Sequence, residues 1–147
     1  MATIPAQANL GSIVNHGTAT CLGGNFTNNG SISNNGTFNL NGGTLTNVNG
    51  ANVTNGTGAT WNQGANGILT NGGTLTNAGS YQNNGSISSN GSIVNQGLFN
   101  NNSGGSLENF FKLNNEGTFN NNNQATILNE FELNNSGNFT NNYFLDN

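Results

Sequence analysis

The feature that most constrains this chain is a short repeat that fills almost its whole length. Each unit has Gly, then a polar residue, a large apolar residue, a small residue and Asn, as in Gly43–Asn47, Gly73–Asn77 and Gly91–Asn95. Most of the apolar centres recur every six residues, with occasional longer steps. Six residues are too few for a helix and a strand together, so each unit predicts one short strand and one tight turn.

Every third apolar centre belongs to the same chemical class, and this sets the number of sides. One series is aromatic after its first member: Ala19, Phe38, Trp61, Tyr81, Phe99, Phe119 and Phe139. The second is aliphatic: Ile13, Ile32, Val53, Leu75, Ile93, Leu113 and Leu133. The third is aliphatic after its first member: Phe26, Leu45, Leu69, Ile87, Leu107, Ile127 and Leu145. Sorting by class predicts an all-β fold, a three-sided parallel β-solenoid of about seven coils with 18–23 residues each. Parallel crossovers are nearly always right-handed, so we expect a right-handed β-helix.

Asn residues recur at the predicted corners of this solenoid. Two positions after each centre of the second series stands an Asn: Asn15, Asn34, Asn55, Asn77, Asn95, Asn115 and Asn135. Alternate residues of a strand point to the same face, so these amides should point inward and bond to one another. The third series has a similar row, with Ser89 at one position: Asn28, Asn47, Asn71, Asn109, Asn129 and Asn147. We therefore interpret the 38 Asn residues mainly as structural.

Over residues 12–147 this Asn- and Gly-containing repeat resembles the filamentous haemagglutinin-type proteins, which are bacterial surface β-helices. The resemblance implies export and an adhesive role at the cell surface. We divide the chain into an N-terminal adapter segment at residues 1–12 and a β-solenoid domain at residues 13–147. The opening residues lack a basic stretch before an apolar one, so we expect no signal peptide there.

The composition argues against catalysis and nucleic-acid binding. Only 4% of the residues are charged, Arg is absent, Lys112 is the single Lys and the net charge is −4. Catalysis needs titratable groups or metal ligands, and nucleic-acid binding needs a basic surface. We therefore predict that the protein is not an enzyme and takes no cofactor, metal or nucleic acid. No apolar run is long enough to span a membrane.

The few reactive side chains have structural interpretations. We expect His16 to be an exposed turn residue and Cys21 to fill a corner, and a single Cys allows no internal disulfide. Lys112 and Glu132 each precede a centre of the second series, one coil apart. We therefore expect them to pair across neighbouring strands.

The two ends of the predicted solenoid favour self-assembly. We expect each end to expose an open strand edge and an apolar cross-section, and such edges pair with other chains. The expected interface residues are Ile13, Ala19 and Phe26 at one end and Leu133, Phe139 and Leu145 at the other. Head-to-tail contacts that do not close produce filaments. Our leading hypothesis is a structural protein that polymerises with itself into an extracellular or cell-surface fibre.

Other functions stay open at this point. An adhesive module would recognise surface glycans through the longer turns at residues 46–52, 54–60 and 62–68. An ice-binding solenoid would use Thr-x-Thr units such as Thr44–Thr46 and Thr74–Thr76. A polysaccharide-active enzyme on a β-helix would need a cluster of Asp, Arg or Lys on one face, and the sequence does not offer one.

Overall fold

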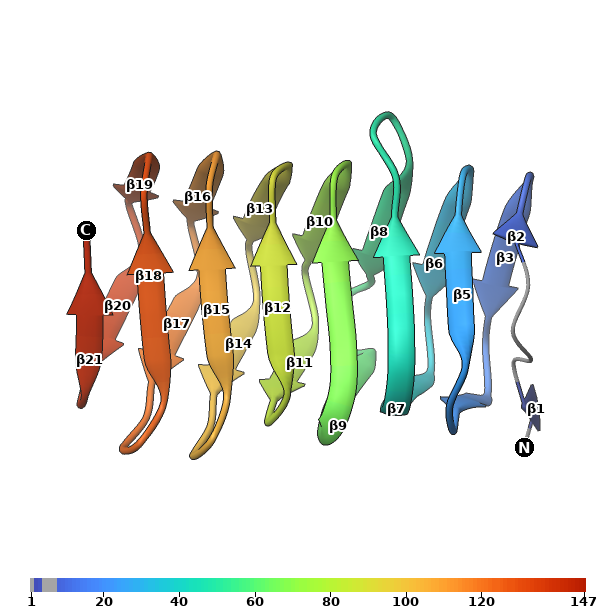
Figure 1. Ribbon diagram of the computed structural model, residues 1–147, viewed down its shortest axis with the longest axis horizontal. Helices are drawn as coiled ribbons and strands as arrows, with labels where there is room; N and C mark the ends of the chain where they lie inside the picture. The colour runs from blue at the N-terminus through green and yellow to red at the C-terminus, as the bar shows by residue number, and fades with distance from the viewer. Residues whose placement is uncertain (1, 4–7) are drawn as a thin grey trace.

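A computed structural model describes residues 2–3 and 8–147, and these form a three-sided parallel β-solenoid of about seven coils (Figure 1). The described residues contain strands and turns but no helix. The chain advances from the N-terminus at the right to the C-terminus at the left, with the front strands running upward and the return path running downward behind them (Figure 1). This sense of rotation is right-handed. The predicted fold class is confirmed.

Each coil has three faces, which we number in chain order. Face 1 is a seven-stranded sheet with one strand from each coil. Its strands carry the second apolar series and are β3 (Ser12–Asn15), β6 (Ser31–Asn34), β8 (Asn52–Asn55), β10 (Thr74–Asn77), β13 (Ser92–Asn95), β16 (Lys112–Asn115) and β19 (Glu132–Asn135).

Faces 2 and 3 form one 14-stranded sheet because two long strands, β7 (Thr37–Asn47) and β9 (Thr60–Asn71), continue round the corner between them. The other strands of face 2 are β1 (Ala2–Thr3), β4 (Thr18–Cys21), β11 (Ser80–Asn83), β14 (Leu98–Asn101), β17 (Thr118–Asn121) and β20 (Asn138–Asn141). Those of face 3 are β2 (Ala8–Asn9), β5 (Asn25–Asn28), β12 (Ser86–Ser89), β15 (Ser106–Asn109), β18 (Thr126–Asn129) and β21 (Phe144–Asp146).

The apolar series pair with themselves from coil to coil. Ile93 is the partner of Leu113 on face 1, Phe99 of Phe119 on face 2, and Leu107 of Ile127 on face 3. Coil length varies without disturbing this register, because extra residues enter at the corners. The longest step joins the two corner residues Asn47 and Asn71, which are 24 positions apart and so one beyond the expected range.

The aromatic residues of face 2 form one continuous stack inside the solenoid. Ring centroids of successive members lie 4.1–5.8 Å apart, and the ring planes are within 18° of parallel. Trp61, Tyr81, Phe99 and Phe119 are fully buried. The Tyr81 hydroxyl donates a hydrogen bond of 2.6 Å to Gln63 Oε1, and burial raises the pKa of Tyr81 well above its ordinary value. Burying each large side chain contributes roughly 1.5–3 kcal/mol, before the cost of ordering the chain.

The N-terminal end has a partial coil that the apolar pattern did not reveal. β1 pairs with β4 and β2 pairs with β5, so that Ala2 lies beside Ala19 and Asn9 beside Asn28. Ala19 and Phe26 are only 5% and 1% exposed, whereas Ile13, on the face without such an additional strand in the described chain, is half-buried. The open side of the stack at this end is therefore formed by β1, β2 and β3. Residues 1 and 4–7 of the predicted adapter segment lie outside the described residues.

We expect the substitution Phe99→Ala to lower the free energy of unfolding by about 3–5 kcal/mol, because it removes a ring from the middle of the stack and leaves a cavity. The matched control is Phe131→Ala, whose ring is 69% exposed and whose loss should change stability by less than about 1 kcal/mol. Urea unfolding followed by circular dichroism measures both. Equal losses of unfolding free energy at the two positions would mean that the buried stack stabilises the fold no more than an exposed ring does.

Candidate functional site

The described residues do not gather the side chains of a metal site, since no group of three or more His, Cys, Asp and Glu residues is close enough together among them. Lys112 Nζ lies 3.3 Å from Glu132 Oε1, so the predicted pair across β16 and β19 is confirmed. Hydrogen bonds from Asn134 and from Lys112 lower the pKa of Glu132. His16 is exposed, and burial raises the pKa of Cys21, which keeps it in the thiol form. In the part of the chain that is described, no helix is long and apolar enough to cross a membrane.

Inward-pointing amides occupy the corner between faces 1 and 2, and we call them row 1. Its members are the seven Asn residues predicted from the second series: Asn15, Asn34, Asn55, Asn77, Asn95, Asn115 and Asn135. The Nδ2 group of every member except Asn135 donates to Oδ1 of the Asn in the next coil at 2.7–2.9 Å. The Nδ2 group of Asn95 also donates to the carbonyls of Gly97 and Thr118, so it ties two turns together. The expected inward stacking is confirmed.

Row 3 lies at the corner between faces 3 and 1 and contains one interruption. It runs from Asn9 through Asn28, Asn47, Asn71, Ser89, Asn109 and Asn129 to Asn147. Ser89 accepts from Asn71 and donates its only hydroxyl proton to the Gly91 carbonyl. No donor in the described chain therefore reaches the buried Oδ1 of Asn109.

Row 2, at the corner between faces 2 and 3, was missed by the sequence analysis. Asn83, Asn101, Asn121 and Asn141 are linked there by amide hydrogen bonds of 2.7–2.8 Å. The first coils have Cys21, Leu40 and Gln63 at the equivalent positions, and this mixture concealed the row. The signal was present in the later coils, where an Asn stands two residues after each aromatic centre.

The amide rows give the stack a direction. In all three rows, Nδ2 of the earlier coil donates to Oδ1 of the later coil, as from Asn115 to Asn135. At the C-terminal end the Nδ2 groups of Asn135 and Asn141 bond only to carbonyls of their own turns. At the N-terminal end the Oδ1 atoms of Asn9 and Asn15 accept only from backbone N–H groups of their own turns. Within the described residues, one end therefore presents amide donors and the other presents amide acceptors.

The apolar residues of the last coil are less well covered than those of the middle coils. Leu133, Phe139 and Leu145 are half-buried, although they occupy the same register as fully buried residues one coil earlier. The strands β19, β20 and β21 pair with described strands on one side only. Of the predicted interface residues, these three and Ile13 therefore lie in the terminal strands of the described stack, and Ala19 and Phe26 lie one strand further in.

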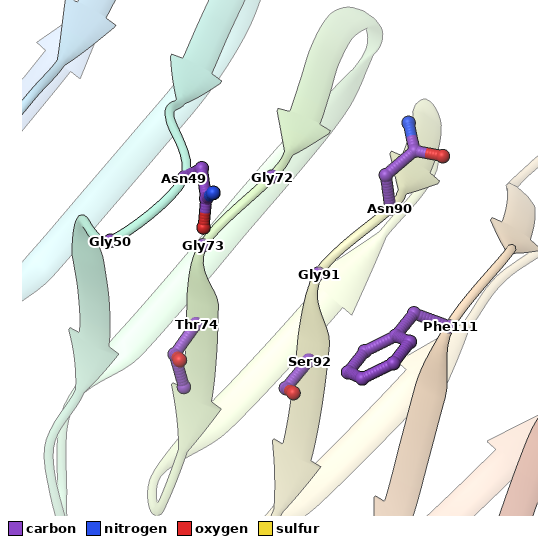
Figure 2. A pocket seen from close by; sticks show the side chains of 9 residues that line it. All are labelled: Asn49, Gly50, Gly72, Gly73, Thr74, Asn90, Gly91, Ser92 and Phe111. Carbon is purple, nitrogen blue, oxygen red and sulfur yellow. The ribbon is translucent and has the colours of Figure 1, made fainter.

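The corner between faces 3 and 1 also has a groove of about 360 Å³ on its outer surface. Its lining comes from four successive corners: Asn49, Gly50, Gly72, Gly73, Thr74, Asn90, Gly91, Ser92 and Phe111. Figure 2 shows the Phe111 ring lying beside Ser92, with the side chains of Asn49 and Asn90 at the glycine corners. The loop that contributes Asn49 is one of the longer turns noted in the sequence.

Comparison with known proteins finds no matching family model, no matching curated protein and no matching solved structure. The structure shows a parallel β-solenoid of about seven turns, and these comparisons give no evidence that the chain belongs to the filamentous haemagglutinin-type family.

Replacing Asn95 by Ala should lower the free energy of unfolding by about 1–3 kcal/mol, because it leaves the Asn115 amide and two turn carbonyls without a buried partner. Gln96→Ala is the control at the next position, where the side chain is exposed. Chemical denaturation of both variants measures the difference. If the loss of unfolding free energy for Asn95→Ala equals that for Gln96→Ala within error, row 1 does not stabilise the coils.

The opposite change is expected at the interruption of row 3. Ser89→Asn supplies an amide donor to the buried Oδ1 of Asn109 and should raise the free energy of unfolding by about 1 kcal/mol. The same spacing carries an amide bond elsewhere in row 3, since Asn129 and Asn147 are also 18 residues apart and bond at 2.6 Å. Ser88→Asn, which adds the same group on the outer face, is the control. Lower stability of Ser89→Asn would show that the interruption relieves crowding.

Proposed function

We propose that this chain is a structural protein whose coil stacks join head to tail into a fibre outside the cell or on its surface. The observation that carries the proposal is the complementarity of the two open ends. One end presents the amide donors of Asn135 and Asn141, and the other presents the amide acceptors of Asn9 and Asn15. Two like ends could not continue the rows, so the joint has to be head to tail.

The joint follows from the strand order at each end. In a second copy, β1 would continue face 2 beyond β20, and β2 would continue face 3 beyond β21. Among the described residues, face 1 has one strand fewer than the other two faces, so β19 and β3 of the next copy would be separated by the position of one strand. Row 3 would then run from Asn147 to Asn9 of the next copy. On face 2, Ala2 of the next copy would take the register position beyond Phe139, because Ala2 is the partner of Ala19.

The physical driving forces favour this joint. Pairing β20 and β21 with β1 and β2 of the next copy satisfies backbone N–H and C=O groups, and covering the apolar residues of the last coil removes them from water. With 4% charged residues and a net charge of −4, repulsion between copies is weak. A heterologous contact of this kind does not close on itself, so it extends into a filament.

Electron microscopy of the purified chain tests the proposal. We expect filaments for the unmodified protein and short or no filaments for Leu145→Lys, which places a charge in the cross-section of the last coil. Leu98→Lys is the matched control, since Leu98 points outward from the middle of the stack and is 37% exposed. Its filaments should be unchanged.

Circular dichroism on the same variants separates assembly from folding, because both substitutions should leave the middle coils folded. A chain that sediments as a monomer at high concentration would contradict the proposal. Filaments of Leu145→Lys as long as those of the unmodified protein would equally contradict it.

A further inference from the structure

The groove at the corner between faces 3 and 1 is a built feature of the coil path. Its floor includes Gly73 and Gly91, where an added Cβ would lie 2.1 Å from the Ala51 carbonyl oxygen and 2.0 Å from the Gly73 carbonyl oxygen. No side chain fits at either corner, so the floor stays low. The loop around Asn49 and Gly50 rises at one end, and the Phe111 ring closes the other.

The groove is polar without being charged. Asn49 and Asn90 are exposed, and Thr74 and Ser92 lie half-buried along the groove. Among the described residues, none of these four side chains makes a hydrogen bond to another protein group, so their amide and hydroxyl groups are available to a ligand. No ionisable side chain lines the groove.

An aromatic ring completes the lining. Phe111 is 47% exposed, and its ring is held from the far side by Phe131, with the two ring centroids 6.1 Å apart and the planes 10° from parallel. A ring supported in this way offers one apolar face to the groove. Contact with Phe131 on the next coil restricts the motion of the Phe111 ring, which lowers the entropic cost of binding a ligand against that ring.

From this lining we infer that the groove binds a neutral saccharide chain that lies extended along the solenoid axis. Hydroxyl-rich, uncharged ligands pair with amide and hydroxyl side chains, and the C–H face of a sugar ring packs on an aromatic ring. The four corners are separated by three coil steps of about 4.8 Å each, which is close to the length of one sugar ring in an extended β-linked chain. The groove therefore takes about three sugar units, with one on Phe111. This site does not depend on the proposed fibre.

A second copy of this chain is a poorer occupant of the same groove. The exposed rings beside it are Phe110, Phe111 and Phe131, at 36%, 47% and 69% exposure, which is roughly 300 Å² of apolar surface. A stable protein interface needs about 800 Å² from each partner. A protein surface would also have to cover the four unbonded polar side chains without a regular set of partners for them.

Isothermal titration calorimetry with three hexasaccharides tests the inference on the whole chain. Cellohexaose and chitohexaose are extended β-linked chains, and maltohexaose is a curved α-linked chain of the same size. We expect at least one β-linked chain to bind more tightly than maltohexaose. Phe111→Ser should weaken that binding about tenfold, the loss expected for one aromatic packing contact.

Phe144→Ser is the matched control, because its ring is 49% exposed and lies outside the groove. It should leave saccharide affinity within about twofold of the unmodified protein. Filaments of Phe111→Ser examined by electron microscopy keep this result apart from the fibre proposal, since the substitution should not alter assembly.

Three outcomes would overturn the inference. The first is that neither β-linked chain binds at millimolar concentration. The second is that Phe111→Ser binds as well as the unmodified protein, which would put the site elsewhere. The third is that Phe111→Ser changes the sedimentation of the protein while no saccharide binds, which would make the groove a contact between copies.

Discussion

The structure depends on one repeated interaction, the hydrogen bond between buried amides of successive coils. The core is only one side chain wide on each face, so the polar turns at its corners lie directly against apolar residues. A buried amide without a partner costs about 1–3 kcal/mol. An Asn one coil away offers both a donor and an acceptor at the strand spacing. The Asn95 side chain bonds to an Asn on either side and to two carbonyls, so each coil supplies the hydrogen-bond partners that the buried amides of its neighbours need.

The faces and the corners of the coils have different roles in the fold. The faces keep a constant length and hold the aromatic stack and the aliphatic series in register. The corners absorb differences in coil length, and some of them need Gly because the chain passes too close to the coil beneath. At Gly97, for example, an added Cβ would lie 2.2 Å from the Gly79 carbonyl oxygen. The corners therefore determine the shape of the outer surface, including the groove at Phe111.

Particular residues show how far the sequence leads. The register of Trp61 and Phe99, the inward position of Asn95 and the pairing of Lys112 with Glu132 all follow from a pattern that repeats in every coil. Row 2 was not predicted because the first three coils have Cys21, Leu40 and Gln63 at its positions instead of Asn. The strands β1 and β2 were not predicted because each is only two residues long and contains no large apolar residue.

The sequence by itself determined the solenoid, its three sides, its approximate coil length and two of its amide rows, because each of these is stated several times over in a periodic pattern. The tertiary structure alone decided the donor-to-acceptor direction of the rows, the unpaired Oδ1 of Asn109 and the strands that form the two open ends. It also decided that Phe111 stands at the end of a glycine-floored groove. These features depend on which coil lies against which and on the path of corners that have no period. Local pattern therefore sets the repeat, and only the stacked coils set its ends and its surface.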